Sequence, residues 1–584
     1  MKYKHLSILI LIAMMHSPAG AASIRKEKPV RQVSVQRIDS MPDMPGSYRM
    51  IDWKAKAKAF DAYVFDWNNT DKMGPLIWKD DARRNVDQTT FGLYTAIGDV
   101  RQGPDNNGGE FHEALNSMAA ILGAGLCGID KTSQNGYNYV RMLQNYFNRD
   151  NGWNIVMNNT NPRVSNLGGG YGRDWWYDIL PNALYYAVCD VFPDVEGSEH
   201  ILRSVAEQFA KADSVLDGNY DYSYFDYGRM KGGRSDIPYQ QDAAGGHAYV
   251  LLQAYKKFGD KRYLRHAQSA IEALLSQEES RFYEALLPLG VYAAAFLNAT
   301  EGKDYDTHKL LDWVFDGCKS PTGRTGWGII VGKWGKYDVS GLQGSLIDNG
   351  GYAFLMNSIK PVWPFVPMVK YEPEYADAIG KWMLNNASAC RLFFPGYIDG
   401  ENQWASEYKD ITHNNIAYEG LRKHDDYGMH YLKGVSPVAI GDGPKWITGN
   451  PTVSMFSVYS TSPIGILGAV VDTTDVEGIL KLDCNATDFY SARPYPVYLI
   501  YNPYATEKTV TYRTASQNCD LFDVITKQYV ARNVRSGRRI AIPAKHSRLI
   551  YEFPAGTPVV RKGNRLIAGK KNIILYMREN TQNL

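Results

Sequence analysis

This chain of 584 residues has few cysteines and almost no net charge, and it lacks the common metal-binding and nucleotide-binding motifs. Its six cysteines form no C-x-x-C pair, which argues against a cysteine-bound zinc ion. Lys and Arg total 64 against 62 Asp and Glu, so no charge excess favours nucleic acid or an anionic membrane as a partner. G-x-G-x-x-G, P-loop and H-E-x-x-H patterns are missing, so nucleotide and zinc-protease chemistry lack support. We expect neither a metal nor a cofactor.

Long apolar runs are also missing, apart from a short one at the start. Lys2 and Lys4 precede an apolar run over residues 6–15, and small residues follow at 19–22. This pattern predicts a secretory signal over residues 1–22. No later stretch approaches the roughly 18 apolar residues of a membrane span, and no cysteine follows the small residues. We expect a secreted or periplasmic protein with no membrane span and no lipid anchor.

The cysteines leave one disulfide open. Cys484 and Cys519 lie in the same C-terminal region, and an exported protein permits a bond between them. The other four lie far apart, mostly in apolar helical stretches, where cysteine commonly acts as a small buried side chain.

Aromatic residues are the unusual surplus. The chain holds 41 Tyr and 13 Trp, more than a core needs, and amphipathic rings suit the apolar faces of sugars. Carbohydrate is therefore the favoured class of ligand.

Helical periodicity dominates from about residue 50 to residue 430. Helices that are apolar all round alternate with amphipathic ones, as at 174–191 followed by 198–216. Repeated pairs of a buried and a solvent-facing helix predict a mainly α fold, an (α/α)6 toroid over residues 50–430, with an irregular bundle as the alternative. The expected helices are Trp53–Trp67, Thr90–Val100, Glu110–Leu126, Tyr137–Phe147, Asp174–Val191, Ser198–Leu216, Asp242–Phe258, Lys261–Ser276, Arg281–Thr300, Tyr305–Phe315, Ser345–Ile359 and Pro373–Leu392.

Beyond residue 430 the pattern changes to short β-branched or aromatic runs between Gly, Pro and Asn. These runs predict a C-terminal β-sandwich over residues 435–584. The expected strands are Val453–Tyr459, Ile464–Val471, Ile479–Leu482, Val497–Tyr501, Thr509–Tyr512, Leu521–Val524, Arg539–Ile542 and Ser547–Phe553.

Acids stand at the starts of the expected inner helices, each after a Gly-rich or aromatic loop. Capping and the helix dipole favour acids in a first turn, so one such acid alone does not indicate a site. The set does, because in a toroid of parallel inner helices these ends meet at one mouth, where aromatic side chains also gather. The acids are Glu110, Glu113, Asp174, Asp178, Asp242, Glu284 and Asp348, and the aromatic residues are Trp175, Trp176, Tyr239, Trp327, Trp334 and Tyr337.

Acids crowded with aromatic rings at a cavity mouth indicate glycoside cleavage, in which one carboxylic acid protonates the leaving oxygen and a second carboxylate assists attack. We select Glu284 as the acid, with Asp174 or Asp348 as base or nucleophile. Asp242, His247 and the aromatic residues of this set are expected to contact the substrate. Inversion and retention stay open, because the separation of the carboxylates decides between them.

Arginines in the same loops favour an acidic sugar. Arg173, Arg229 and Arg234 each offer a bidentate contact to a substrate carboxylate, although ion pairs within the loops explain them equally well. His247, in D-A-A-G-G-H, is a further candidate, and so is the Tyr-rich segment 220–229. A His or Tyr that abstracts the proton α to a uronate carboxylate would make the protein a lyase.

Six strings then resemble secreted six-hairpin enzymes of glycoside hydrolase family 154, the exo-β-glucuronidase type. They are Asp174–Asp178, Tyr283–Pro288, Gly326–Asp338, Asp348–Phe354, Ile416–Leu421 and Tyr498–Tyr504. The resemblance covers nearly the whole chain after the signal. It implies a toroid with a C-terminal β-sandwich and a glycan that ends in glucuronate, and it assigns no catalytic residue.

Together these observations predict an exported glycosidase that removes terminal β-linked glucuronic acid from a complex glycan. A uronate-specific polysaccharide lyase on the same scaffold and a non-catalytic glycan-binding protein are the alternatives. Linkage, aglycone and oligomeric state stay open.

Overall fold

The structure is a computed structural model, which describes residues 27–81, 85–98, 113–149, 152–158, 174–319, 326–347, 351–424, 432–441 and 450–577. The expected signal segment 1–22 lies outside these residues. Within the described ranges, no helix is both long and apolar enough to cross a membrane.

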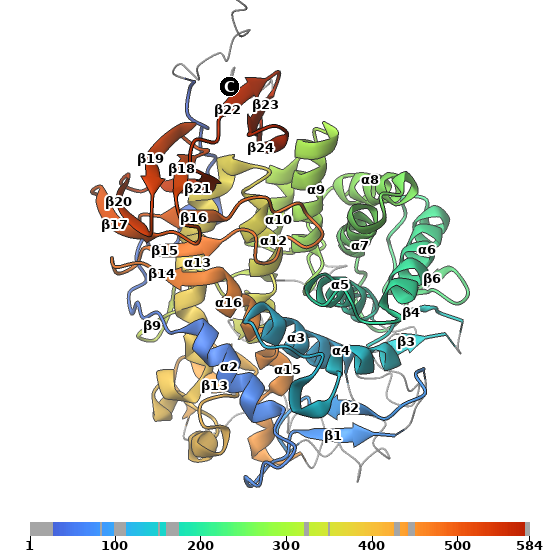
Figure 1. Cartoon of the computed structure of the whole chain (residues 1–584). Coiled ribbons are helices and arrows are strands. Elements are labelled where there is room, and N and C mark those ends of the chain that lie inside the picture. The colour runs from blue at the N-terminus through green and yellow to red at the C-terminus, as the bar shows by residue number, and fades with distance from the viewer. Residues whose placement is uncertain are drawn as a thin grey trace, which may run out of the picture.

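Six inner helices form a closed ring (Figure 1). In order around the ring they are α3 (Ala114–Leu126), α5 (Trp176–Val191), α7 (Ala243–Phe258), α9 (Leu287–Glu301), α12 (Val362–Met368) and α16 (Ile464–Val470). Each packs on the next, and α16 packs on α3 as well, which closes the ring. This arrangement agrees with the predicted toroid.

Amphipathic helices cover the outside of the ring. They are α2 (Trp53–Val64), α6 (Ser198–Leu216), α8 (Lys261–Leu275), α10 (Thr307–Asp316) and α13 (Ala376–Ala389). The contrast with the ring follows from composition, since α9 is buried from Leu287 to Ala299 whereas α8 buries only one side.

Glycines let neighbouring inner helices approach closely. A Cβ on Gly290 of α9 would lie 2.8 Å from the Cα of Gly245 of α7. A Cβ on Gly465 of α16 would lie 2.2 Å from the Cα of Gly123 of α3. Any larger residue at these positions would push the helices apart, so these glycines allow the tight packing of α7 on α9 and of α16 on α3.

The last ring helix corrects a prediction. Residues 464–471 were expected as a strand, but 464–470 form α16, and residues 453–459 contain a 3₁₀ turn (Thr452–Met455) and the start of α15 (Val458–Thr461). Burial within the ring outweighs the β-branched composition of this segment. A division at residue 435 therefore does not separate the helical elements from the sheet elements.

Four strands of a five-stranded antiparallel sheet also lie within the expected helical region, and the fifth, β13, lies just beyond it. Its order is β13 (Val438–Ile440), β12 (Gly420–Arg422), β11 (Tyr352–Phe354), β10 (Gln343–Ser345) and β7 (Trp327–Ile329). The helix expected over 345–359 is therefore wrong in its first part, where β10 ends and β11 follows, and α11 (Leu355–Ile359) forms only its end. The helix expected over 90–100 is wrong too, since β2 (Thr90–Leu93) pairs with β1 (Ile77–Asp80).

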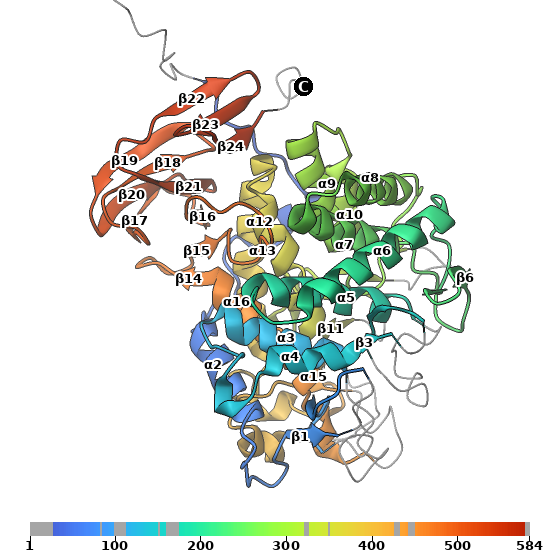
Figure 2. The same ribbon diagram turned by 45° about the vertical axis from the view of Figure 1, so that its right-hand side comes forward.

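The C-terminal strands gather at one side, against α12 and α13 (Figure 2). The six-stranded sheet has the order β14 (Val471–Thr473), β15 (Leu480–Asp483), β16 (Val497–Tyr501), β21 (Ser547–Pro554), β18 (Cys519–Asp523) and β19 (Gln528–Val534). The two-stranded antiparallel sheet of β17 (Lys508–Arg513) and β20 (Gly537–Ile542) shares a separate apolar core with this sheet. A three-stranded sheet follows, made of β22 (Val559–Lys562), β23 (Arg565–Ala568) and β24 (Asn572–Tyr576).

Cys484 and Cys519 are buried free thiols in this region, so the disulfide left open by the sequence is not formed. The remaining short elements are α1 (Gln36–Asp39), α4 (Tyr139–Met142), β3 (Phe147–Asn148), β4 (Ile155–Val156), β5 (Tyr224–Asp226), β6 (Lys231–Gly233), β8 (Lys333–Trp334) and β9 (Tyr337–Asp338).

Candidate active site

Four acids lie at or just before the N-terminal ends of four ring helices. Glu113 precedes α3, Asp174 precedes α5, Asp242 precedes α7 and Glu284 precedes α9. Glu113, Asp174 and Glu284 all act electrostatically on the hydroxyl of Tyr177, in the first turn of α5. The structure therefore brings these ends together at one mouth of the ring.

Glu284 is half-buried and lies three residues before α9, not in its first turn. The amide of Asn357 in α11 donates to its Oε2 at 3.5 Å, and the amide of Gln343 in β10 donates to its backbone carbonyl at 2.6 Å. The five-stranded sheet and α11 thus hold Glu284 in place.

Glu113 is buried, and both of its carboxylate oxygens accept hydrogen bonds. Thr95 Oγ1 donates to Oε2 at 2.8 Å, and Asn158 Nδ2 donates to Oε1 at 3.0 Å. An ionised carboxylate accepts bonds in this way. The sequence shows Glu113 only as one acid among several, and we did not select it.

Lys360 is a buried cation beside these acids that the sequence analysis missed. Its Nζ lies 4.5 Å from the ring centroid of Trp176 and 3.5 Å from Oδ1 of Asn357. Burial lowers the pKa of Lys360 to about 7, against the opposing effect of the Glu284 and Glu113 carboxylates. The one sequence signal is a lysine between α11 and α12 in an otherwise apolar stretch.

Two tyrosines, also missed, face the same acids. The hydroxyl of Tyr459 in α15 lies 3.5 Å from that of Tyr177. Burial raises both pKa values far above the ordinary value, and Glu113 and Glu284 raise them further. Both hydroxyls therefore stay protonated at neutral pH and can donate hydrogen bonds.

Asp174 is held through Gln240, whose side chain joins two chain segments. The Gln240 amide donates to Asp174 Oδ1, and its carbonyl accepts from the backbone N–H of Trp176 at 2.8 Å. Asp178, in the first turn of α5, is fully buried, and neither of its carboxylate oxygens has a hydrogen-bond partner among the described residues. Burial raises the pKa of Asp178 well above its ordinary value, which favours its neutral form.

Asp242 connects the starts of α7 and α9. Its Oδ2 accepts from the backbone N–H of Tyr283 at 3.2 Å, next to Glu284. Burial raises the pKa of Asp242 to about 7, and the negative charge of Glu284 adds to this. We predicted Asp242 as a substrate contact, but it lies beneath the mouth and positions the loop that carries Glu284.

Trp175 and His247, both predicted to contact substrate, lie in an aromatic core instead. The Trp175 indole donates to the hydroxyl of Tyr227 at 3.2 Å, and His247 Nε2 lies 2.8 Å from the same oxygen. Phe209 and Tyr220 pack against His247, which has no exposed surface. Trp176, also buried, lies beside the acid cluster, where its ring contacts Lys360.

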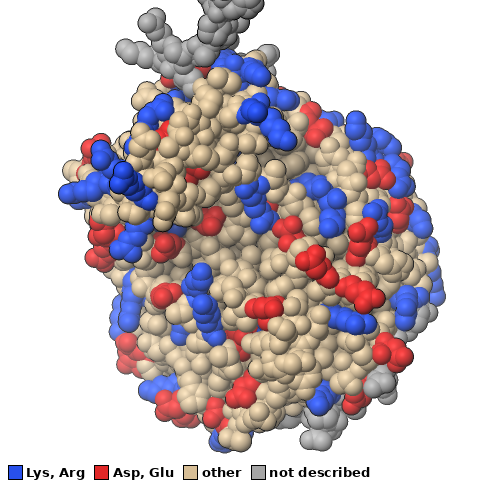
Figure 3. Space-filling model, viewed as in Figure 1, with Lys and Arg blue, Asp and Glu red and all other residues tan. Residues whose placement is uncertain are grey.

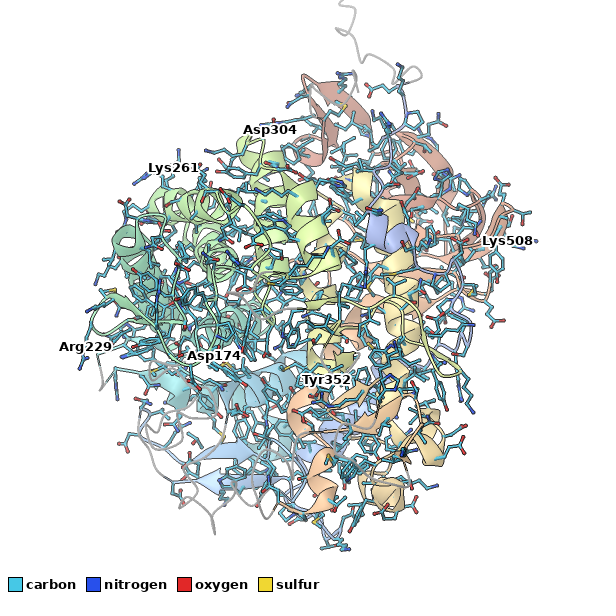
Figure 4. All side chains as sticks on the ribbon, turned by 180° about the vertical axis from the view of Figure 1, so that it is seen from behind. Asp174, Arg229, Lys261, Asp304, Tyr352 and Lys508 are labelled. Atoms are coloured by element: carbon cyan, nitrogen blue, oxygen red, sulfur yellow. The ribbon has the colours of Figure 1, made fainter. Side chains whose placement is uncertain are left out.

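The predicted arginine clamp finds no support in the two arginines that are described. The Arg229 side chain is 87% exposed, pairs with Asp226 and lies at the outer edge of the molecule, away from Asp174 (Figure 4). Arg234 pairs with Asp221 at 3.3 Å and stacks on Tyr239. Ordinary pairing within the loops explains both side chains.

The other aromatic candidates divide between two places. Trp327 in β7 packs near Tyr283, with ring centroids 6.4 Å apart, and so borders the loop of Glu284. Tyr337, in the hairpin that also holds the buried Trp334, borders a separate pocket of about 820 Å³ with Glu401 and Trp404. Arg173 and Asp348 lie outside the described residues, as do Glu110 and the glycine loop before Arg173.

In the described part of the chain, no cluster of three or more His, Cys, Asp or Glu is arranged to hold a metal ion. The chemistry that this mouth offers is that of carboxylates, tyrosine hydroxyls and one ammonium. That set can donate and accept protons on opposite sides of a bound group.

No family model matches the chain, and no curated protein matches it in sequence. Among solved structures it is similar to a GH127 β-L-arabinofuranosidase from Geobacillus stearothermophilus T6, with 12% identity, a TM-score of 0.37, and 90% of this chain and 85% of that one covered. An unsaturated glucuronyl hydrolase from Streptococcus agalactiae gives 12% identity, a TM-score of 0.33, and coverage of 76% and 98%. The endoglucanase CelQ from Clostridium thermocellum is 12% identical, with a TM-score of 0.33, and the match covers 91% of this chain and 100% of that one. At this level the likenesses assign neither a family nor an activity, and membership of glycoside hydrolase family 154 stays a prediction.

Proposed function

We propose that the protein is a glycoside hydrolase that removes terminal β-linked glucuronic acid from a complex glycan. One observation carries the proposal: Glu113 and Glu284 come from opposite helices of the ring and act on the same buried cluster. Two carboxylates on opposite sides of a substrate group are what hydrolysis of a glycosidic bond requires.

Glu284 is the proton donor in this proposal. It is half-buried, so it can reach the glycosidic oxygen, and it follows the buried rings of Phe282 and Tyr283. Glu113 replaces the earlier choice of Asp174 or Asp348 as the ionised partner, since both of its oxygens are fixed by hydrogen bonds. Asp174, tied to Gln240, is the second candidate for that role.

Lys360 supplies the preference for a uronate. Its ammonium is buried beside Glu113 and Glu284. A substrate carboxylate bound there would pair with this ammonium in place of the two glutamates. This contact takes the place of the predicted arginine clamp.

A uronate lyase is the second candidate, because the Tyr177 and Tyr459 hydroxyls lie side by side at the acids. Their raised pKa values make both poor bases at neutral pH, which favours the hydrolase.

The test is to incubate the purified protein with a panel of aryl glycosides and with uronate polysaccharides. Hydrolysis yields reducing ends and a saturated sugar, whereas a lyase yields an unsaturated uronate that absorbs in the near ultraviolet. Unsaturated product in wild-type protein would overturn the proposal in favour of the lyase, and binding with neither product would indicate a glycan-binding protein. Export is part of the proposal, and N-terminal sequencing of the mature protein checks it.

A further inference from the structure

A second cavity lies at the opposite end of the ring from the acids. Its volume is about 530 Å³, within the range of small-ligand sites. Lys256 and Gly259, at the C-terminal end of α7, line one side, with Phe296 and Thr300 of α9. Residues of the loop 484–496, which joins β15 to β16, and residues of β24 line the other side. The cavity thus lies between the helical ring and the C-terminal strands.

The floor of this cavity carries excess positive charge. Lys370 Nζ lies 2.7 Å from Asp488 Oδ2, and Lys256 Nζ lies 3.7 Å from Oδ1 of the same carboxylate. Tyr371 and Ser491 also donate to this carboxylate, so one fully bonded anion serves two buried lysines.

Further cations surround the rim, and Lys and Arg atoms are visible on both sides of this junction in Figure 3. Arg493 is neutralised by Asp190, at 2.5 Å, whereas the exposed Lys571 forms no ion pair with the described residues. Lys257 lies 5.5 Å above the ring of Tyr490. Two further acids act on groups of this cavity: Glu301 acts on Tyr255 and Tyr576, and Asp483 interacts with Lys370. The five Lys and Arg side chains named here therefore exceed the four carboxylates by one positive charge.

Tyr490 is held in this cavity at a conformational cost. Its φ of +54° lies in the left-handed region, which a tyrosine rarely occupies. Its hydroxyl is buried and has no hydrogen-bond partner among the described residues. A strained backbone with an unused donor is typical of a ligand contact.

From this geometry we infer that the cavity binds an anionic saccharide. The rings of Tyr371, Tyr490, Tyr495 and Tyr576 offer faces and hydroxyls to sugar rings, and the side chains of Asn485 and Asn572 add polar groups. The lysines offer partners for a carboxylate or sulfate. Binding here involves no bond cleavage, so it anchors an acidic glycan away from the acid cluster.

The test is calorimetric titration of the Glu284→Gln protein with a tetrasaccharide of glucuronic acid, and with its neutral glucose counterpart. Two sites are expected for the acidic probe. Ala492→Trp fills the cavity from an exposed lining position, and Lys571→Glu reverses a rim charge. Each should weaken one site at least tenfold and leave hydrolysis of an aryl glycoside by the otherwise wild-type protein unchanged.

Lys570→Glu is the matched control, since Lys570 is exposed next to Lys571 but does not line the cavity. It should leave both sites intact. A single site in the parent protein, two sites unaffected by Ala492→Trp and Lys571→Glu, or equal binding of the neutral probe would overturn the inference. Because binding is measured apart from turnover, these outcomes do not depend on the proposed hydrolysis.

Discussion

Glu113 and Glu284 precede α3 and α9, which lie opposite each other in the ring, yet both carboxylates act on the buried ammonium of Lys360. Two ring helices separate them on either side. This relationship depends on ring closure, because α16 must join α12 to α3 before the two acids face one space. The substrate group is therefore expected to lie between the two carboxylates, with Lys360 beneath it.

Replacing Glu284 with Gln keeps the side-chain shape and removes the proton that the leaving oxygen needs. Turnover of a natural glycan should fall roughly 10²- to 10⁴-fold, the usual contribution of a positioned proton donor. Activated aryl glycosides should lose less, because their leaving groups need little protonation. Initial rates on both substrates measure this, and Glu278→Gln, at an exposed position, is the control. Unchanged turnover of the glycan would remove Glu284 from the role.

Replacing Glu113 with Gln removes the second charge and keeps a partner for Asn158. If Glu113 assists attack, kcat should fall to a similar extent on natural and activated substrates, since the attack step is common to both. The same assay on Asp174→Asn tells the two candidate partners apart. Loss in Asp174→Asn with normal rates in Glu113→Gln would assign the role to Asp174.

Lys360→Met tests the contact with the uronate carboxylate. Lys360 is charged below its pKa of about 7 and neutral above it, so KM for a glucuronide should rise as pH passes through 7. The Met variant should show a KM raised about 10- to 100-fold at pH 6, the size of one charged hydrogen bond, and a flat profile. A neutral glycoside should show no such change in KM. Lys261→Met, on the outer helix α8, is the control (Figure 4).

The long helices could be predicted from sequence, whereas the ring closure could not. The helix over 198–216 was predicted with its observed ends because its apolar stripe persists over many turns and a Gly precedes it. In contrast, the strands at 327–329 and 352–354 are three residues long, so no alternation can develop. The helix at 464–470 is β-branched and becomes helical through its burial against α2 and α3.

Some residues of the candidate site could likewise be predicted from the sequence, and others could not. Asp174 and Glu284 could be found because acids at predicted helix starts stand out along the sequence. Lys360 and Tyr459 could not, since each belongs to an apolar segment far along the chain and faces the acids only in three dimensions. Tyr459 reaches the mouth through a segment that was predicted to be a strand.

Asp242→Asn should raise stability at neutral pH. Burial raises the pKa of Asp242 to about 7, so between pH 4 and 7 the folded state holds a proton that the unfolded state has lost. Stability contributed by this proton is present below pH 4 and is lost as pH rises through 7. The Asn variant lacks this loss. The difference in free energy of unfolding between variant and wild type should therefore be more favourable to the variant at pH 8 than at pH 4, by on the order of 2–4 kcal/mol. Thermal unfolding at both pH values measures it. Parallel curves for variant and wild type would show that Asp242 ionises normally.

His247→Leu separates a core role from a substrate contact. His247 bonds Tyr227 within the aromatic core, and burial lowers its pKa to about 3. The unfolded chain binds a proton below about pH 6.5 that the folded chain does not take up, so wild-type stability falls as pH drops towards 4.5, by about 2–3 kcal/mol from this group. The Leu variant should lose about 1–3 kcal/mol at pH 8, where only the hydrogen bond is missing, and should lack that acid-dependent fall.

Urea unfolding at pH 8 and pH 4.5 provides both values for His247→Leu, with His200→Leu, at an exposed position on α6, as the control for a surface histidine. The folded variant should keep the wild-type KM, because His247 has no exposed surface at the mouth. A raised KM with unchanged stability would instead place His247 against the substrate, as the sequence alone had suggested.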